Sequence, residues 1–305
     1  MKKYSVESCT DRAFSELTTL GSGGKIKITV YPDSARKLVK IVCLLERLKV
    51  AYCLLGKGSN VLASDDDYDG VVVVTTKMKS FRVMGRSVYA LAGASTVTIG
   101  SELKRRGLTG GEFLACLPAT IGGAVVTNAG CYGQDMKCIV TGVKALYCGK
   151  IRRISAKKCK FGKRKSIFSL SDGYTILSVK LKLNRSNSEE VARLIKEMRD
   201  KKAATQPLNF RSAGSALFHE KVAVSRLLDE AGLKGYTVGG AQVSTKHAGF
   251  VINIDKATSK DLYLVIRHMQ WTLRQRFGID AKIEIRLINF SEDFTKDSND
   301  VFTGS

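Results

Sequence analysis

The stretch that decides the fold runs from Leu117 to Gly133 and reads LPATIGGAVVTNAGCYG. It holds four glycines, one proline and no charged side chain, although 26% of the residues in the chain are charged. Glycine tolerates positive φ and has no Cβ, so backbone N–H groups in such a run can approach a flat or anionic ligand closely. Small residues also suit a tight, buried crossing of a helix and a sheet. The stretch therefore predicts either a large-cofactor site or a close-packed crossing.

A second glycine-rich stretch, LLGKGSNVLASDD, runs from Leu54 to Asp66. A turn with two glycines, a hydroxyl and an amide directly after an apolar strand is suited to hold a pyrophosphate through backbone donors, with Lys57 supplying charge. The stretch matches neither the GxGxxG pattern of dinucleotide-binding folds nor the GxxxxGK[ST] pattern of P-loops, so neither site is indicated. It favours the cofactor interpretation of the first stretch.

The length and the cysteine content restrict the class of protein. At 305 residues the chain exceeds what one hydrophobic core usually serves, so two or three domains are expected. No apolar run approaches the roughly 20 residues of a membrane-spanning helix, and the N-terminus lacks a signal-peptide core. We therefore expect a cytoplasmic protein with no membrane partner. The eight cysteines form no CxxC pairs and the three histidines lie far apart, which predicts neither a disulfide framework nor a metal site.

The formal net charge of +22 is the most unusual bulk feature. Lysine and arginine are densest between Lys144 and Lys165, a segment without the aromatic interleaving that stacks nucleic-acid bases. Such charge usually solvates a surface, and a positive field also attracts small polyanions. A basic nucleic-acid-binding protein is an alternative from a different class, and it predicts a colourless preparation with salt-dependent oligonucleotide binding.

The N-terminal half predicts two small α/β units. In the first, Lys25–Tyr31 alternates like a half-buried strand, and Asp33-Ser34 offers an N-cap for the following helix. The apolar face expected for that helix consists of Leu38, Ile41, Val42, Leu45 and Leu48. The other segments expected are strands at 51–55, 71–75, 87–92 and 175–183, and a helix at 97–106 closed by Gly107.

The C-terminal part predicts an α+β domain. Ser186-Asn187-Ser188-Glu189 forms a capping box for a helix over 189–203, and Thr258 to Asp261 forms another for a helix that stops at Gly278. The apolar positions expected to be buried in that last helix are Leu262, Val265, Ile266, Met269 and Leu273. A helix over 222–231 and a strand over 249–254 lie between. The polar tail 291–305, with four acidic residues, is expected to be disordered.

Together, GKGSN and LPATIGGAVVTNAGCYG closely resemble the flavin-binding motifs of the UDP-N-acetylenolpyruvoylglucosamine reductase family. Further similarity runs nearly the whole way from Thr18 to Ile288, including Leu227–Asn253. The resemblance implies an α+β fold in which a two-part FAD-binding domain of the vanillyl-alcohol-oxidase (PCMH) type precedes a C-terminal α+β substrate-binding domain. The expected limits are a lead-in at 1–20, the FAD-binding domain at 21–185 with parts at about 21–78 and 79–185, and the substrate-binding domain at 186–290.

The resemblance also implies site residues. The positions that match the family's flavin motifs are Gly56, Lys57, Gly58, Ser59, Asn60, Pro118, Thr120, Ile121, Gly122, Gly123, Ala124, Asn128, Gly130, Tyr132 and Gly133. Three positions match catalytic residues: Arg164 in FGKRKSIF, Ser215 in RSAGSALF and Glu284 in KIEIRL, an alternating strand with Ile283, Ile285 and Leu287 inward. The short connection from Arg164 to Ser215 resembles the compact subtype, which lacks an extra substrate loop.

The sequence also departs from the family pattern. Lys163 and Lys165 replace the usual tyrosine and aspartate around Arg164. The usual PGT and MNAG are here PAT and TNAG, which are small changes in a loop that stays small. The FKNP-like run after SAGS is Leu217 to Glu220, and this change puts individual nucleotide-sugar contacts in doubt.

The three catalytic matches suit one reaction. Hydride addition to an enolpyruvyl double bond puts negative charge beside the carboxylate, which an arginine can stabilise. The resulting enolate is basic enough to take a proton from a serine. A protonated glutamate with a raised pKa could hydrogen-bond the enolate or the carboxylate.

The resemblance therefore implies an NADPH-dependent FAD enzyme that reduces UDP-N-acetylglucosamine enolpyruvate to UDP-N-acetylmuramate in peptidoglycan precursor synthesis. NADPH and the UDP-sugar are the expected partners. Cell wall biogenesis, cell shape and cell division would depend on this step. An FAD-dependent oxidase of another small substrate is the alternative within the same fold, and it would consume oxygen in place of NADPH.

Overall fold

The computed structural model describes residues 6–171 and 173–291, and the chain divides into two compact units. The first unit comprises Met1–Thr10, Ile28–Lys57 and Gly70–Lys202, and the second comprises Asp11–Lys27, Gly58–Asp69 and Ala203–Ser305. The division therefore passes through the second glycine-rich stretch, between Lys57 and Gly58. The domain limits expected from the sequence stay a prediction. The expected disorder of the tail concerns residues that, apart from Ser291, lie outside the described ones.

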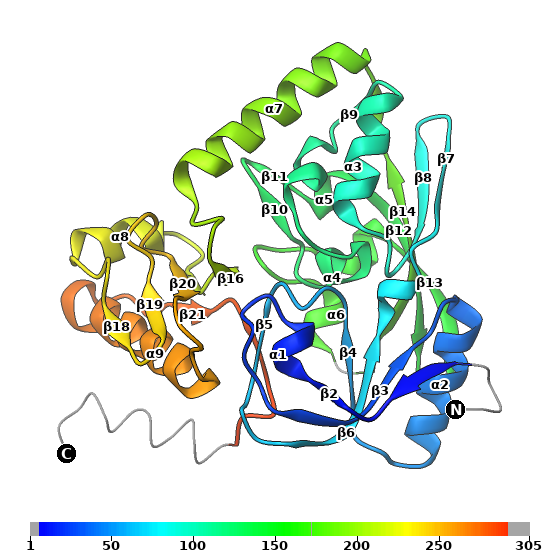
Figure 1. Cartoon of the computed structure of the whole chain (residues 1–305). Helices are drawn as coiled ribbons and strands as arrows, with labels where there is room; N and C mark the ends of the chain where they lie inside the picture. Colours follow the sequence, from blue (N-terminus) through cyan, green and yellow to red (C-terminus); the bar gives the residue numbers. More distant parts are fainter. Residues whose placement is uncertain (1–5, 172, 292–305) are drawn as a thin grey trace. The chain divides into compact units, whose positions relative to one another are not determined.

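A mixed sheet of order β1-β3-β6-β4 opens the first unit (Figure 1). β1 (Glu7–Cys9) is antiparallel to β3 (Lys25–Tyr31), and β4 (Tyr52–Leu55) is parallel to β6 (Tyr68–Val74). β2 (Arg12–Ala13) pairs with Lys25 and Ile26 at the start of β3, and these residues belong to the second unit. The expected strands are thus confirmed, with shifts of one to three residues at their ends. The parallel pair ends where GKGSN begins.

Helix α2 (Ala35–Arg47) follows β3 and confirms the expected N-cap. The Ser34 side chain accepts a hydrogen bond from the Lys37 N–H, which satisfies one of the free donors of the first turn. The buried residues of the helix are Leu38, Ile41, Val42 and Leu45. The expectation for Leu48 is wrong: it is 59% exposed because the helix ends before it.

An antiparallel sheet of order β13-β12-β14-β8-β7 completes the framework of the first unit. Its strands are β7 (Phe81–Met84), β8 (Ser87–Leu91), β12 (Val140–Tyr147), β13 (Lys150–Ser155) and β14 (Thr175–Lys182). Helix α3 (Thr96–Arg105) is capped by Ser95 and is followed by Gly107 at φ 59°, as expected from the sequence. One hydrophobic core, from Val6 to Leu183, joins the two sheets and their helices.

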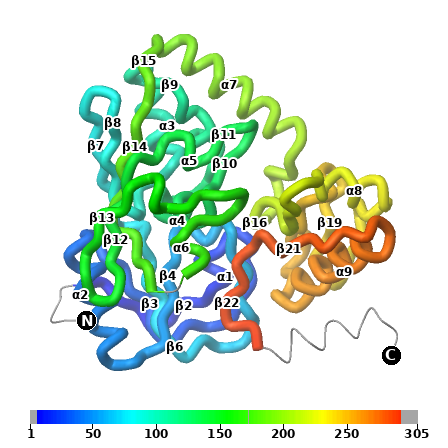
Figure 2. Tube along the Cα trace, turned by 180° about the vertical axis from the view of Figure 1, so that it is seen from behind, coloured from blue at the N-terminus to red at the C-terminus, as the bar shows by residue number. Residues whose placement is uncertain are grey.

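Short elements connect this framework. The helices are α4 (Ile121–Val126), α5 (Met136–Ile139) and α6 (Ile167–Leu170), and the 3-10 turns are η2 (Thr75–Lys77), η3 (Glu112–Cys116) and η4 (Ala156–Cys159). The short strands are β9 (Leu108–Thr109), β10 (Gly130–Cys131), β11 (Gln134–Asp135) and β15 (Asn184–Arg185). α4 and α6 lie side by side, as Figures 1 and 2 both show.

The sheet of the second unit has the order β16-β20-β19-β18 and is antiparallel (Figure 1). Its strands are β16 (Arg211–Ser215), β18 (Thr237–Val238), β19 (Ala241–Val243) and β20 (Phe250–Asn253). The other elements are α1 (Phe14–Leu17), α8 (Val224–Glu230), α9 (Ser259–Phe277), β5 (Val61–Ala63), β17 (Leu217–Phe218), β21 (Lys282–Ile283) and β22 (Arg286–Ile288). The core of this unit runs from Leu20 to Ile285 in sequence.

Helix α9 confirms its predicted signals. The capping box between Thr258 and Asp261 is formed in both directions, and the helix ends at Gly278 with φ 65°. The five apolar positions named from the sequence are all buried. Intrinsic periodicity and caps sufficed here because they act within one helix.

Two other expectations are wrong. Helix α7 (Ser188–Thr205) is capped by Asn187, whose Oδ1 accepts the Glu190 N–H at 2.7 Å, and not by Ser186. KIEIRL is not one strand: it forms β21 and β22, which pair with β17 and β5 respectively. Ile285 is buried, whereas Ile283 and Leu287 are only half-buried. The change of partner after Ile283 interrupts the alternation that the sequence displays.

Among the described residues, no helix is long and apolar enough to cross a membrane.

Candidate functional site

The decisive glycine-rich stretch folds into helix α4 and a tight hairpin. Thr120 caps α4 by accepting the Gly123 N–H at 3.3 Å. Gly122 is buried, and a Cβ there would lie 3.0 Å from the Ala92 carbonyl oxygen. Gly123 is exposed, and a Cβ there would meet only the Thr120 hydroxyl. The two interpretations of the stretch therefore apply to different glycines: Gly122 serves packing, whereas Gly123 leaves space for a ligand where a side chain would lie.

The side chains of Ile121 and Ala124 are buried in the core of the first unit, so any contact that they make with a cofactor would come from backbone atoms. Pro118 is exposed ahead of the helix cap.

A hairpin follows α4. β10 and β11 pair with Cys131 opposite Gln134, and the two residues between them, Tyr132 and Gly133, have φ of 54° and 82°. Two successive positive φ angles are the signature of a type I′ turn. The first strand passes so close to the second that a Cβ on Gly130 would collide with the Gln134 carbonyl oxygen.

Tyr132 is suited to meet a group that the protein alone does not supply. Its hydroxyl is buried and has no hydrogen-bond partner within residues 6–171 and 173–291. Burial raises the pKa of this phenol, so the group stays a neutral donor. The Lys201 ammonium lies 5.4 Å from the centre of the Tyr132 ring. An orphaned buried hydroxyl in the same stretch as the exposed Gly123 fits a polar, planar cofactor such as a flavin.

Each of the two glycines of GKGSN packs tightly against another segment of the chain. In the first unit, a Cβ on Gly56 would collide with the Thr120 hydroxyl, so the two glycine-rich stretches meet there. In the second unit, Gly58 has φ 64°, and a Cβ there would collide with the Leu17 carbonyl oxygen. The Gly58 carbonyl accepts the Thr19 N–H at 3.1 Å. Gly58 is therefore required by packing, whatever it binds.

The remaining residues of this motif differ in exposure. Lys57 is exposed and Ser59 is half-buried. Asn60 is half-buried, and its Nδ2 donates to the Glu284 carbonyl oxygen at 3.1 Å. Its own carbonyl accepts the Arg286 N–H at 3.0 Å. Asn60 thus fixes the backbone around Glu284.

Ser215 lies at the end of β16, directly after a bulge. The register between β16 and β20 shifts between Ser212 and Ser215, and Gly214 has φ 83° with open space around its Cβ position. Bulges with a positive-φ glycine re-aim the following side chain and are frequent beside active sites. The next residue, Ala216, accepts the Glu284 N–H on its carbonyl at 2.8 Å. The structure therefore brings the Ser215 and Glu284 segments together within the second unit.

Arg164 lies in the first unit, in a tight turn. Gly162 and Lys165 exchange two backbone hydrogen bonds of 2.9 and 3.3 Å across it. Arg164 has φ 56°, which costs a non-glycine residue about 1–3 kcal/mol. Its Nη1 donates to the Gly130 carbonyl at 3.3 Å. The turn is thus held against the glycine-rich hairpin.

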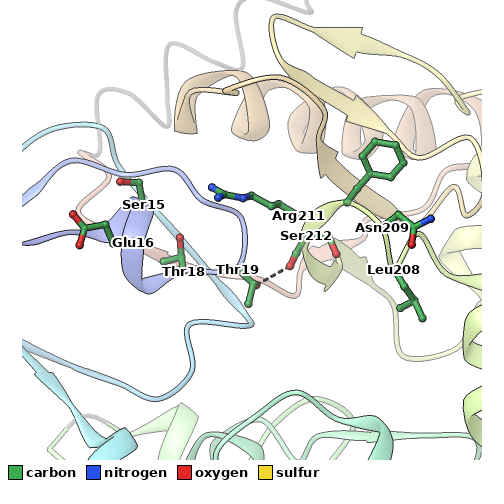
Figure 3. Close-up of a pocket in the computed structure, with 9 residues that line it drawn as sticks. Ser15, Glu16, Thr18, Thr19, Leu208, Asn209, Arg211 and Ser212 are labelled. Atoms are coloured by element: carbon green, nitrogen blue, oxygen red, sulfur yellow. Dashed lines mark hydrogen bonds between the residues drawn. The ribbon is translucent and has the colours of Figure 1, made fainter.

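A pocket of about 530 Å³ lies in the second unit between α1 and the start of β16 (Figure 3). The Arg211 side chain reaches across it toward Ser15, and the Thr19 hydroxyl donates to the Ser212 carbonyl at 2.7 Å (Figure 3). A Cβ on Gly21 would collide with the Arg211 guanidinium, so this glycine makes room for the side chain. The pocket combines hydroxyls, a cation and the exposed Phe210.

Sequence reasoning missed two supports of the Arg164 turn. Asn128 donates from Nδ2 to the Gly162 carbonyl at 3.0 Å, and Ser166 donates from Oγ to the Val126 carbonyl at 2.7 Å. Ser166 is completely buried. An SI pair after an arginine gives no local signal for such a contact, because the partner is 40 residues away in sequence.

The cysteines are consistent with the interpretation as small buried residues or surface thiols. Burial raises the pKa of Cys131 and Cys159 to about 11, so both remain thiols at neutral pH. Within the described residues, no group of three or more His, Cys, Asp or Glu side chains could hold a metal ion.

Two family models match the chain. The FAD binding domain model matches residues 26–155, and the model of the UDP-N-acetylenolpyruvoylglucosamine reductase C-terminal domain matches residues 206–288. These matches confirm the expected order of a flavin-binding and a C-terminal domain.

Proteins that match this chain over nearly their whole length share one name. UDP-N-acetylenolpyruvoylglucosamine reductases from Caldanaerobacter subterraneus and Clostridioides difficile are both 35% identical to this chain, over 273 and 269 residues. The first match covers 89% of this chain and 90% of the relative, and the second covers 87% and 88%. The crystal structure of UDP-N-acetylenolpyruvylglucosamine reductase (MurB) from Thermus caldophilus matches with a TM-score of 0.79 and 28% identity, over 93% of this chain and 98% of that chain. From this similarity and the two domain matches, the chain belongs to the UDP-N-acetylenolpyruvoylglucosamine reductase family of FAD-containing oxidoreductases.

Proposed function

We propose that this enzyme reduces the enolpyruvyl group of UDP-N-acetylglucosamine enolpyruvate to give UDP-N-acetylmuramate in peptidoglycan precursor synthesis, with NADPH as reductant. The observation that carries the proposal is identity of 35% over 89% of the chain to a reductase of this name. A cytoplasmic location is part of the proposal. The charge of +22 accords with the proposed substrates, because a positive field would draw these polyanions.

The proposed FAD ligands are the backbone around Gly123, the Tyr132 hydroxyl and the GKGSN turn. The open side of Gly123 and the orphaned Tyr132 hydroxyl support this assignment. When bound, FAD would take a hydride from NADPH and supply it to the enolpyruvyl double bond.

Ser215 is the proposed proton donor. Hydride addition leaves negative charge on the carbon beside the carboxylate, and the Ser215 hydroxyl would give its proton to that carbon. The bulge at Gly214 supports this role because it sets the direction of the Ser215 side chain independently of the strand.

Arg164 and Glu284 are the proposed stabilisers of the developing charge. A guanidinium bonds a carboxylate or enolate with charge-assisted hydrogen bonds, and the strained φ of Arg164 is typical of a functional position. Glu284 would act in its protonated form, as a hydrogen-bond donor. Its half-buried side chain and its backbone bonds to Ala216 and Asn60 support a fixed orientation.

The test is a spectroscopic titration of the purified holoenzyme. We expect a flavin spectrum that NADPH bleaches under anaerobic conditions and that UDP-N-acetylglucosamine enolpyruvate restores, with one equivalent of UDP-N-acetylmuramate formed. Restoration by oxygen but not by the enolpyruvyl substrate would instead indicate an oxidase. A colourless protein that binds oligonucleotides would contradict the proposal entirely.

A further inference from the structure

The side-chain amide of Asn128 forms hydrogen bonds with other residues of the protein. The residue is 2% exposed and lies just after α4 at φ 47°. Its Nδ2 donates to the Gly162 carbonyl at 3.0 Å and to the Asp135 carboxylate at 2.8 Å, and its Oδ1 accepts the Lys137 N–H at 2.8 Å. Both donors of the amide are therefore used. Little of this side chain is left for a cofactor.

These bonds converge on the turn that carries Arg164. The Gly162 carbonyl accepts both from Asn128 and from the Lys165 N–H, which closes the turn. The Arg164 guanidinium donates to the Gly130 carbonyl, two residues beyond Asn128. One short loop therefore holds the turn at its backbone and the arginine at its head group.

The turn needs such support because Arg164 is in the left-handed region. A strained φ persists only where surrounding contacts over-determine it. Without the bond to Gly162, the 162–165 turn can relax, and relaxation of φ would move the guanidinium. A shift of about 1 Å at a positioning group can cost on the order of 100-fold in rate.

We propose that Asn128 is a positioning residue for Arg164 and not a ligand of the cofactor. The proposal rests on the proposed role of Arg164 in the reduction of the enolpyruvyl substrate.

The experiment compares Asn128→Ala, Arg164→Ala and the double variant as purified holoenzymes. For Asn128→Ala we expect full flavin content and flavin reduction by NADPH within a few-fold of the wild type. Reoxidation by the enolpyruvyl substrate should be about 10–100-fold slower. Reoxidation in the double variant should be no slower than in Arg164→Ala alone, because Asn128 acts only through the Arg164 side chain and that side chain is absent.

Asn253→Ala is the matched control. Asn253 is also buried, and it ties backbone through Nδ2 to the Leu20 carbonyl at 2.9 Å and through Oδ1 to the Ala257 N–H at 2.9 Å, within the second unit. Asn253→Ala should lower the melting temperature about as much as Asn128→Ala does. Any slowing of reoxidation that it causes should add to the slowing caused by Arg164→Ala.

Hydrogen exchange gives a readout that does not depend on turnover. Asn128→Ala should speed exchange at the Lys165 amide, which closes the turn, and Asn253→Ala should not. If the alanine variant does not fold, the exchange of Asn128→Asp with Asp135→Asn keeps the shape, the bond from Lys137 and a bond between the two side chains while removing the donor to Gly162. Loss of flavin, additive kinetic losses in the double variant, or unchanged exchange at Lys165 would each overturn the proposal. Failure of the proposed function would appear separately, as wild-type reduced flavin that the enolpyruvyl substrate does not reoxidise.

Discussion

The segments that carry Arg164 and Glu284 are fixed in opposite ways. Arg164 lies in a tight turn at positive φ, which two backbone bonds close and the glycine-rich loop supports. Glu284 lies between two short strands in ordinary backbone geometry. Its N–H bonds Ala216 and its carbonyl accepts from Asn60, so distant parts of the second unit hold it.

This difference shows what each segment tolerates. The positive φ of Arg164 destabilises its turn, and hydrogen bonds from neighbouring residues offset this cost. A residue that adopts positive φ without strain should therefore stabilise the turn. An extended segment held by partners on both sides has no strain to release. Substitutions that act only through backbone freedom should therefore change the stability of the two segments in opposite directions.

The largest effect is expected at the glycines, where the same substitution separates packing from binding. Gly58→Val should lower the free energy of unfolding by about 2–6 kcal/mol, because it adds strain at φ 64° and a collision with Leu17. Gly123→Val, at an exposed position, should fold and lose flavin. Chemical denaturation and the flavin-to-protein absorbance ratio measure both. A stable Gly123→Val with stoichiometric flavin would remove this glycine from the proposed site.

The next effect concerns Ser215, which directly precedes the residue whose carbonyl accepts the Glu284 N–H. Ser215→Ala should slow reoxidation of reduced flavin by the enolpyruvyl substrate by about 10²–10⁴-fold, because the general acid is gone. Reduction by NADPH needs no such proton and should be nearly unchanged. Rapid mixing with detection of the flavin band follows both steps. Equal slowing of both would assign Ser215 to positioning and make Glu284 the first candidate for the donor.

A smaller effect compares the two segments directly. Arg164→Gly should have a free energy of unfolding roughly 1 kcal/mol above that of Arg164→Ala, since glycine adopts φ 56° without strain and both variants lose the same side chain. Glu284→Gly should lie roughly 0.5–1 kcal/mol below Glu284→Ala, through added freedom of the unfolded chain. Urea unfolding of the four holoenzymes gives the two differences. Changes of the same sign would show that the strain at Arg164 is not what distinguishes the segments.

An effect of similar size is expected at Asn60. Asn60→Ala removes the bond from Nδ2 to the Glu284 carbonyl and should cost about 0.5–1.5 kcal/mol of stability. It should also slow reoxidation less than Ser215→Ala does, because the Ala216 bond to Glu284 remains. Asn60→Ser serves as the control, because it keeps a polar side chain at this position but shortens it. Slowing as large as that of Ser215→Ala would mean that Asn60 is the main support of Glu284.

Several parts of the molecule followed from local sequence signals. The caps at Ser34 and Thr258, the helix ends at Gly107 and Gly278, and the buried face of α9 all depend on neighbours within a few residues. Such signals are readable because hydrogen bonding and periodicity act over one or two turns of a helix. The similarity of two short motifs to one flavoenzyme family also lies wholly in the sequence, and family membership is confirmed.

Other features were decided only by tertiary structure. The break of KIEIRL into two strands depends on partners at β17 and β5, and the need for Gly58 depends on the Leu17 carbonyl. The role of Asn128 depends on a carbonyl 34 residues away. A sequence shows which residues can bend, donate or pack, but not which distant backbone they meet. That encounter decides whether a glycine or an asparagine in a motif serves the ligand or the fold.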